Sequence, residues 1–130
     1  MGDYTPPNSN GLIPFSSQAS APLTGGQLVT ASGDNTVAPS TTGDHSIGVA
    51  AEDVVTGGRA TIWPILGVRH ETRPQGVVAI TAGTPIIAGT TGFVNTGGTL
   101  GAAAAAGTLL GICTKGGTGG TSLCQWLGTG

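Results

Sequence analysis

The two histidines are the first residues to consider for catalysis, because an imidazole titrates near neutral pH. His45 stands between Asp44 and Ser46, which together are the residue types of an acid–base–nucleophile set. Successive side chains of an extended segment point in opposite directions, so three consecutive residues do not converge on one substrate. The threonines and glycine before them are typical of a turn. We therefore expect a loop end here and assign the trio no catalytic role.

His70 lies in the densest group of charges in the chain, with Arg69, Glu71 and Arg73. Strand alternation would place His70 on the face opposite Arg69 and Glu71. A catalytic role needs a pocket and a second reacting group, and the sequence indicates neither. We take these four residues as candidate subunit contacts, with a solvated strand end as the plainer alternative.

Cys113 and Cys124 are the two cysteines of the chain, and a glycine-rich stretch lies midway between them. A symmetric hairpin would set them opposite each other, with Cα atoms about 4.5 Å apart, at the short end of disulfide geometry. The N-terminus does not read as a secretory signal, so we expect synthesis in a reducing host cytoplasm and free thiols. The sequence leaves the disulfide open. Zinc would require further ligands at suitable spacing, and these are missing.

The stretch from Lys115 to Thr121 superficially resembles a phosphate-binding loop. The lysine precedes the glycines, however, whereas the phosphate loop has it after them, and no helix follows. A carrier lysine would have an acidic neighbour, which is also missing. The stretch predicts a flexible hairpin tip, and we expect no cofactor, no metal and no enzyme activity.

Charge excludes further classes of function. The chain has four basic and six acidic residues, a net charge of −2, and only 8% charged residues. Nucleic-acid binding and polybasic membrane anchoring both need clustered lysine and arginine, and no apolar run approaches the roughly 18 residues of a membrane span. Such low charge favours association, so we expect much of the surface to be covered by other protein. A neutral surface that is simply solvated is the alternative.

The elements that position these residues are expected to be β-strands. The chain has 20 threonines, 9 valines and 8 isoleucines, which suit a pleated surface, and 25 glycines for turns. This predicts an all-β fold, a small barrel or sandwich of about nine to ten short strands. The expected strands are Gln27–Ala31, Thr36–Ala38, Ile47–Ala51, Arg59–Pro64, Gly67–Glu71, Val77–Ile80, Pro85–Ala88, Gly92–Asn95, Leu109–Thr114 and Ser122–Leu127.

Two further patterns concern the organisation of this fold. The alanine run Ala102–Ala106 is too short to nucleate a helix alone and predicts a loop or one helical turn. A weak repeat relates the two halves, since Gly48 and Gly111, like Trp63 and Trp126, lie 63 residues apart. A duplicated β unit explains this spacing; chance similarity in a glycine- and threonine-rich chain is the alternative.

Residues 1–22 differ from the remainder, 23–130, which we expect to form a single β domain. Four prolines among asparagines and serines disfavour helix and central strand, so the segment predicts an extended arm. Its apolar residues would serve as docking anchors, with prolines lowering the entropy lost on binding; contact with the arm's own domain is the alternative. The candidate binding residues of the arm are Tyr4, Pro6, Pro7, Leu12, Ile13, Pro14 and Phe15.

Short glycine-containing motifs follow one another in an order that resembles the small capsid decoration (cement) proteins of tailed bacteriophages. The resemblance spans residues 23–127. The motifs are Gly26-Gln27-Leu28-Val29, Gly33-Asp34-Asn35-Thr36-Val37-Ala38-Pro39, Ile47-Gly48-Val49-Ala50, Gly57-Gly58-Arg59-Ala60-Thr61-Ile62-Trp63, Gly67-Val68-Arg69-His70-Glu71, Ala82-Gly83-Thr84-Pro85-Ile86, Gly92-Phe93-Val94 and Leu110-Gly111-Ile112.

The resemblance implies a virion protein that binds the major capsid protein on the outer surface of an icosahedral phage head and stabilises the shell against the pressure of packaged DNA. It also implies a homotrimer, and it brings no catalytic residues. The alternative function is a carbohydrate-binding or adhesion module displayed on a virion. That module would need exposed aromatic rings for sugar stacking, and the chain has five aromatic residues in all.

Overall fold

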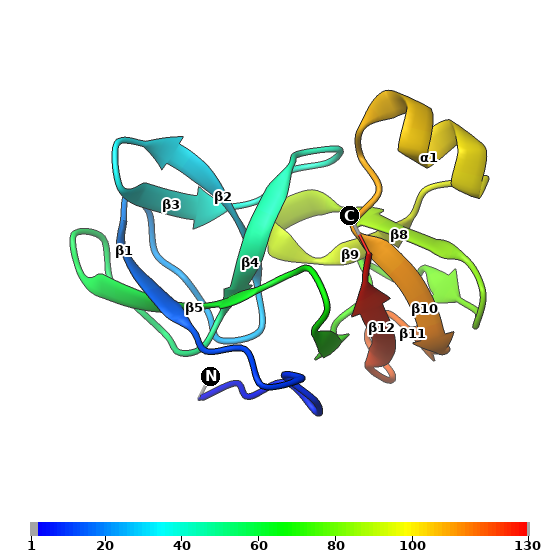
Figure 1. The fold of residues 1–130 in the computed structure, drawn as a ribbon, viewed down its shortest axis with the longest axis horizontal. Coiled ribbons are helices and arrows are strands. Elements are labelled where there is room, and N and C mark those ends of the chain that lie inside the picture. Colours follow the sequence, from blue (N-terminus) through cyan, green and yellow to red (C-terminus); the bar gives the residue numbers. More distant parts are fainter. Residues whose placement is uncertain (1–2, 130) are drawn as a thin grey trace.

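Two five-stranded β units, one from each half of the chain, lie side by side (Figure 1). The computed structural model describes residues 3–129. The first unit is a closed barrel with the strand order β1-β3-β2-β4-β5, in which β1 runs parallel to β3 and the other neighbours are antiparallel. Its strands are β1 (Phe15–Ala19), β2 (Leu28–Gly33), β3 (Thr36–Pro39), β4 (Ser46–Ala50) and β5 (Arg59–Pro64).

The second unit is a five-stranded sheet with the order β6-β12-β10-β8-β9. Its strands are β6 (Arg69–Thr72), β8 (Pro85–Ala88), β9 (Val94–Thr96), β10 (Gly111–Lys115) and β12 (Cys124–Gly128). A separate two-stranded sheet pairs β7 (Ala79–Ile80) with β11 (Gly117–Thr118). The all-β fold predicted from the composition is confirmed.

The topology of the first unit recurs in the second. Read from β1 round the barrel, the order β1-β5-β4-β2-β3 matches β6-β12-β10-β8-β9 strand for strand. The parallel β1–β3 contact that closes the barrel has its counterpart in a single parallel bridge between Pro74 and Val94. The antiparallel bridge between Leu23 and Val54 likewise matches the β7–β11 pair. This shared connectivity is what a duplicated unit predicts.

The register of the two units differs by one residue, and the difference changes the environment of the tryptophans. In the first unit Gly48 pairs with Pro64, the residue after Trp63. In the second, Gly111 pairs with Gly128, two residues after Trp126. Trp63 is half-buried, whereas Trp126 is fully buried.

One hydrophobic core lies inside the first barrel, and a larger one joins the two units. Alternation along the strands divides β2 and β4 between them: Val29 and Ala50 point into the barrel core, and Leu28 and Val49 into the joint core. Leu28–Val29 and Val49–Ala50 are therefore buried on both faces of their strands. The two units therefore pack as one structure.

The alanine run lies in a short helix, α1 (Leu100–Ala106). The hydroxyl of Thr99 accepts a hydrogen bond from the Ala102 N–H at its start. Gly107 ends the helix in the left-handed conformation, with φ of 72°. Two end caps allow a run that is too short to nucleate alone to form its turns.

All ten strands expected from the sequence are present within about two residues. The stretch predicted to be a flexible hairpin tip contains a further strand, β11, which pairs with β7, so that prediction is wrong. β1 was not expected either. Its residues, Phe15–Ala19, fall inside the predicted arm of residues 1–22, so that part of the prediction is wrong. The inward positions of β1 are the small residues Ser17 and Ala19, which give no hydrophobic alternation. Ser17 instead donates its hydroxyl to the carbonyl of Asn35 at 2.8 Å.

Candidate interaction surface

The chain before β1 contacts the second unit through a β-bridge and a side-chain hydrogen bond, and it runs along the lower edge of the molecule in Figure 1. We call residues 3–14 the N-terminal segment. Its backbone bridges to β6, where the N–H of Arg69 donates to the carbonyl of Asn8 at 2.9 Å. The Tyr4 N–H donates to the carbonyl of Ala51 in the first unit. The segment thus contacts both units of its own chain, which is the alternative that the sequence left open for the arm.

Tyr4 is the residue of this segment that packs on the core. Its ring stacks on His70 with centroids 6.0 Å apart, and the His70 ring lies 4.9 Å from that of Trp126. Trp126 donates its indole N–H to the hydroxyl of Thr72 at 2.9 Å. Three aromatic side chains from residues far apart in the sequence therefore form one column at the edge of the joint core.

Hydrogen bonds fix the tautomer of His70. Nε2 lies 2.8 Å from the carbonyl of Pro64, which can only accept, so Nε2 carries the proton. Nδ1 then accepts from the Tyr4 hydroxyl at 2.9 Å. The Tyr4 oxygen in turn accepts the N–H of Glu71 at 3.1 Å. A neutral imidazole satisfies every partner in this set.

Burial makes the neutral state of this cluster the favoured one. Desolvation lowers the pKa of His70 to about 4, against a partly opposing hydrogen bond to Pro64. Desolvation likewise raises the pKa of Tyr4 far above its ordinary value. His70 is fully buried, so its side chain is not available for the subunit contact predicted from its charged neighbours. Its burial depends on Tyr4 and Trp126, which lie far away in the sequence.

The other candidate arm residues divide between packing and exposure. Pro6 is buried, Pro14 is half-buried and Pro7 is exposed. Leu12, Ile13 and Phe15 are exposed by 42%, 80% and 40% of their surface. Three exposed apolar residues within four positions are an unusual concentration in so short a stretch of chain.

A further exposed apolar residue, Leu66, precedes Gly67, whose backbone Leu12 approaches. It lies in the β5–β6 connection and is 64% exposed. The connection contacts Leu12, whose Cδ1 lies 3.7 Å from the position a Cβ would take on Gly67. We call Leu12, Ile13, Phe15 and Leu66 the N-terminal apolar surface. Leu66 was not predicted as a surface residue from the sequence, although an apolar residue between Pro64 and a turn glycine was an available signal.

The remaining charged candidates form separate contacts. Arg69 is exposed, and Glu71 accepts a hydrogen bond from the Gln125 amide at 3.1 Å. The guanidinium carbon of Arg73 lies 5.1 Å from the centre of the Phe93 ring, a cation–π contact. These residues remain accessible for contacts with another protein, unlike His70.

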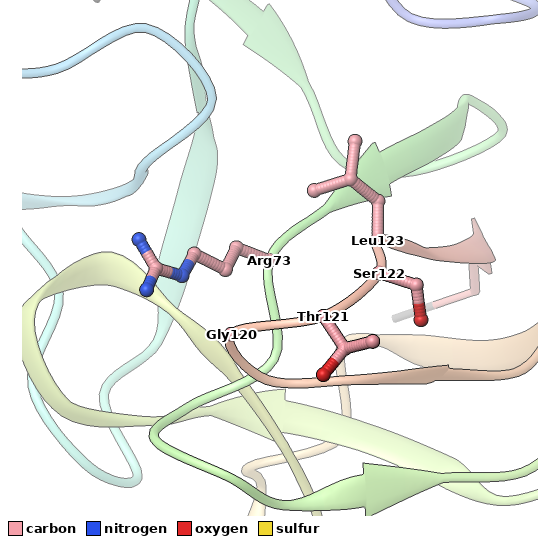
Figure 2. Close-up of a pocket in the computed structure, with 5 residues that line it drawn as sticks. All are labelled: Arg73, Gly120, Thr121, Ser122 and Leu123. Atoms are coloured by element: carbon pink, nitrogen blue, oxygen red, sulfur yellow. The ribbon is translucent and has the colours of Figure 1, made fainter.

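An open pocket of about 310 Å³ lies between Arg73 and the turn Gly120–Leu123 (Figure 2). Figure 2 shows the guanidinium extending away from the turn. The side chains of Thr121 and Ser122 point to one side of the turn and Leu123 to the other. The pocket does not gather its polar groups on one point, as a site for acid–base or nucleophilic catalysis requires.

The Asp44–His45–Ser46 trio, considered above for catalysis, lies at a turn. Asp44 accepts hydrogen bonds from the backbone N–H and hydroxyl of Thr41 and so closes a turn, with His45 exposed beside it. Within residues 3–129, no three histidine, cysteine, aspartate or glutamate side chains form a metal-binding group. No helix among those residues is long and apolar enough to cross a membrane.

The two cysteines are both free and buried. The symmetric hairpin considered from the sequence is not formed: Cys113 pairs with Trp126, and Cys124 pairs with Thr72 on the other side of β12. Burial raises the pKa of Cys124 to about 12 and also raises that of Cys113. Both thiols are therefore protonated and unreactive in the folded protein.

Among the comparisons with known proteins, the comparison of structures found a match. No protein-family model matches the sequence, and no curated protein matches it. The structure is similar to the crystal structure of the head fiber gp8.5 N base in bacteriophage phi29, with a TM-score of 0.68 and 14% sequence identity. The match covers 90% of this chain and 93% of that chain, so the two chains share one fold over most of their length.

Proposed function

We propose that this chain is a structural protein of a bacteriophage virion, bound to the outer surface of the head through the major capsid protein. The observation that carries the proposal is the shared fold with the N base of a phage head fiber, which extends over 90% of this chain. Almost nothing of either chain lies outside the match. A chain that shares the fold of such a base over most of its length is suited to the same place on a virion.

The N-terminal apolar surface is the part of the molecule proposed to contact the shell. Ile13 and Leu66 are 80% and 64% exposed in the isolated chain, and covering such side chains contributes about 25 cal/mol per Å². An icosahedral shell offers many copies of one site, so modest affinity at each copy is enough for high occupancy. Coverage of many sites would reinforce the shell against internal pressure.

Low charge supports assembly with neighbouring copies, and we propose the homotrimer as the state of the protein on the head. Only 8% of the residues are charged, and interface cores are depleted in charge. Arg69, Glu71 and Arg73 are the proposed polar contacts between copies, because they remain at least partly exposed.

The arrangement of the aromatic rings favours attachment over carbohydrate display. Tyr4 and Trp126 stack on His70, and Phe93 lies under Arg73. Among the five aromatic residues, Phe15 is the one that the structure leaves exposed, at 40%. A sugar-binding platform needs several accessible rings, so a glycan array is expected to show no binding.

Sedimentation with phage heads tests the proposal. Heads purified from a phage deleted for this gene are mixed with the purified protein, and bound protein is measured in the pellet. We expect saturable binding and a higher temperature of heat-induced DNA release. If the protein neither binds these heads nor occurs in wild-type virions, the proposed function is wrong.

Matched variants test the attachment surface separately. Ile13→Asp and Leu66→Asp should each weaken binding about tenfold or more, because they place a charge in the proposed contact. Val77→Asp is the control, since Val77 is 84% exposed in the loop before β7. If all three variants bind equally well, the attachment surface lies elsewhere on the protein, although head binding itself would stand.

A further inference from the structure

The N-terminal segment covers the outer edge of an end strand. β6 is the terminal strand of the second sheet, and two of its backbone N–H groups are satisfied by this segment. Arg69 donates to the carbonyl of Asn8 at 2.9 Å, and Glu71 donates to the hydroxyl of Tyr4 at 3.1 Å. Edge strands with free N–H groups pair readily with other chains, so residues 4–8 take the place that a neighbouring strand would fill.

A tight turn brings this segment back onto its own chain. The Leu12 N–H donates to the carbonyl of Ser9 at 2.9 Å, and the Asn10 N–H to the side chain of Asn8 at 2.8 Å. Asn10 and Gly11 both adopt left-handed backbone conformations, with φ of 55° and 80°. For asparagine this conformation is less favourable than an extended one. The turn is exposed, so water can replace both hydrogen bonds when it opens.

We propose that residues 4–8 exchange between two copies of this chain, each segment docking on β6 and His70 of the other copy. The turn from Ser9 to Leu12 is the hinge. The partner copy would then supply the Tyr4 hydroxyl that His70 Nδ1 accepts. Because the two chains are identical, each contact of the closed chain is remade between copies, and only the turn differs.

The site selects a second copy over an unrelated peptide. Its occupant must present a tyrosine hydroxyl between His70 Nδ1 and the Glu71 N–H, and four residues later a carbonyl to the Arg69 N–H. The N-terminal segment has this spacing. Exchange also leaves the first barrel intact, because β1 starts at Phe15, beyond the hinge.

Exchange in the free protein does not depend on attachment to a phage head. Leu12, Ile13 and Phe15 follow the hinge and stay with their own barrel. An exchanged dimer of the free protein would therefore keep one N-terminal apolar surface on each of its two barrels, available for the homotrimer proposed on the head.

Isotope-filtered NMR on the free protein tests the exchange. Labelled and unlabelled wild-type chains are unfolded together, refolded at high concentration, and separated into monomer and dimer by size exclusion. We expect intermolecular NOEs between the Tyr4 ring and the His70 and Trp126 rings in the dimer. A preparation that yields no dimer, or a dimer whose Tyr4 NOEs all arise within one chain, would overturn the proposal.

Two hinge variants should shift the equilibrium in opposite directions. Asn10→Gly removes the cost of the left-handed residue in both closed chains and should lower the dimer association constant about tenfold. Deletion of Asn10 and Gly11 leaves too little chain to reverse direction and should make the dimer the main species. A folded deletion variant that stays monomeric contradicts the proposal; if that variant does not fold, the wild-type spectrum decides. Head binding plays no part in these readouts, so the two proposals can fail separately.

Discussion

The hydroxyl of Tyr4 lies 2.9 Å from Nδ1 of His70, although 66 residues separate them in the chain. This contact joins the N-terminal segment to the edge of the joint core. It also explains why a histidine flanked by charged residues is buried and neutral. The stability of the fold at acid pH should depend on this pair.

Acid should destabilise the protein through His70. Its pKa falls to about 4 in the folded state, against about 6.5 in an unfolded chain. Between these values the unfolded chain binds the extra proton, so the free energy of unfolding decreases as pH falls. The contribution is complete above pH about 6.5, and about 3 kcal/mol is lost on reaching pH 4. Urea unfolding across this range measures it.

The exposed His45 provides the control for this prediction. His45→Gln should leave the acid-dependent loss unchanged, because His45 is exposed in the folded protein. NMR titration of the His70 imidazole assigns the effect directly. A His70 ring that titrates near pH 6.5 would contradict the prediction.

Tyr4→Phe should destabilise the protein although it retains the ring. The change leaves His70 Nδ1 without its donor and the Glu71 N–H without its acceptor. Unsatisfied groups at a largely buried site cost about 1–3 kcal/mol. Chemical denaturation measures the loss, with Ile13→Ala as a control that should change stability by less than about 0.5 kcal/mol. Equal stability of the two variants would contradict the role assigned to the hydroxyl.

Gly48→Ala and Gly111→Ala should both destabilise the fold, which tests the equivalence of the two units. A Cβ at Gly48 would overlap the carbonyl oxygen of Trp63, and one at Gly111 that of Leu127. Forcing paired backbones apart should cost about 1–3 kcal/mol at each site.

A third glycine supplies the matched control. Gly101 lies in α1, and a Cβ there would meet no atom within 4 Å. Gly101→Ala should stabilise the protein by up to about 1 kcal/mol. Thermal unfolding of the three variants measures the contrast, and a neutral Gly111→Ala would show that the β10–β12 crossing tolerates a side chain.

Neither cysteine should react with a thiol reagent until the protein unfolds. Both are buried, and burial raises the pKa of Cys124 to about 12. A reagent such as DTNB should therefore modify no thiol in the native protein and two per chain in denaturant. Labelling of the native protein at the rate of a free thiol would show that the joint core opens locally.

Local sequence patterns predicted most strands because β-branched residues lie within them and glycine-containing turns lie beside them. β1 escaped prediction because its inward residues, Ser17 and Ala19, are small and one of them is polar. The joint core could not be predicted from the sequence either. It depends on which face of β2 and β4 meets the second unit, and a strand's own pattern does not specify its partner.

The candidate surface was predicted only in part, because local sequence again does not specify contacts between distant segments. Exposed Leu12 and Ile13 follow from proline-rich sequence with scattered apolar residues, whereas Leu66 joins them only through the fold. His70 was misassigned to the surface because its immediate neighbours are charged. Its real surroundings come from Tyr4, Pro64 and Trp126.

The sharing of β2 and β4 between two cores has an evolutionary consequence. A gene encoding only the first half would leave Leu28, Val49 and Ile65 without the partners that bury them. If the two units arose by duplication, a single ancestral unit would have had to cover these positions differently, by pairing with itself or by carrying polar residues there. With this face apolar, neither half could be lost, transferred or shuffled alone without exposing it to water.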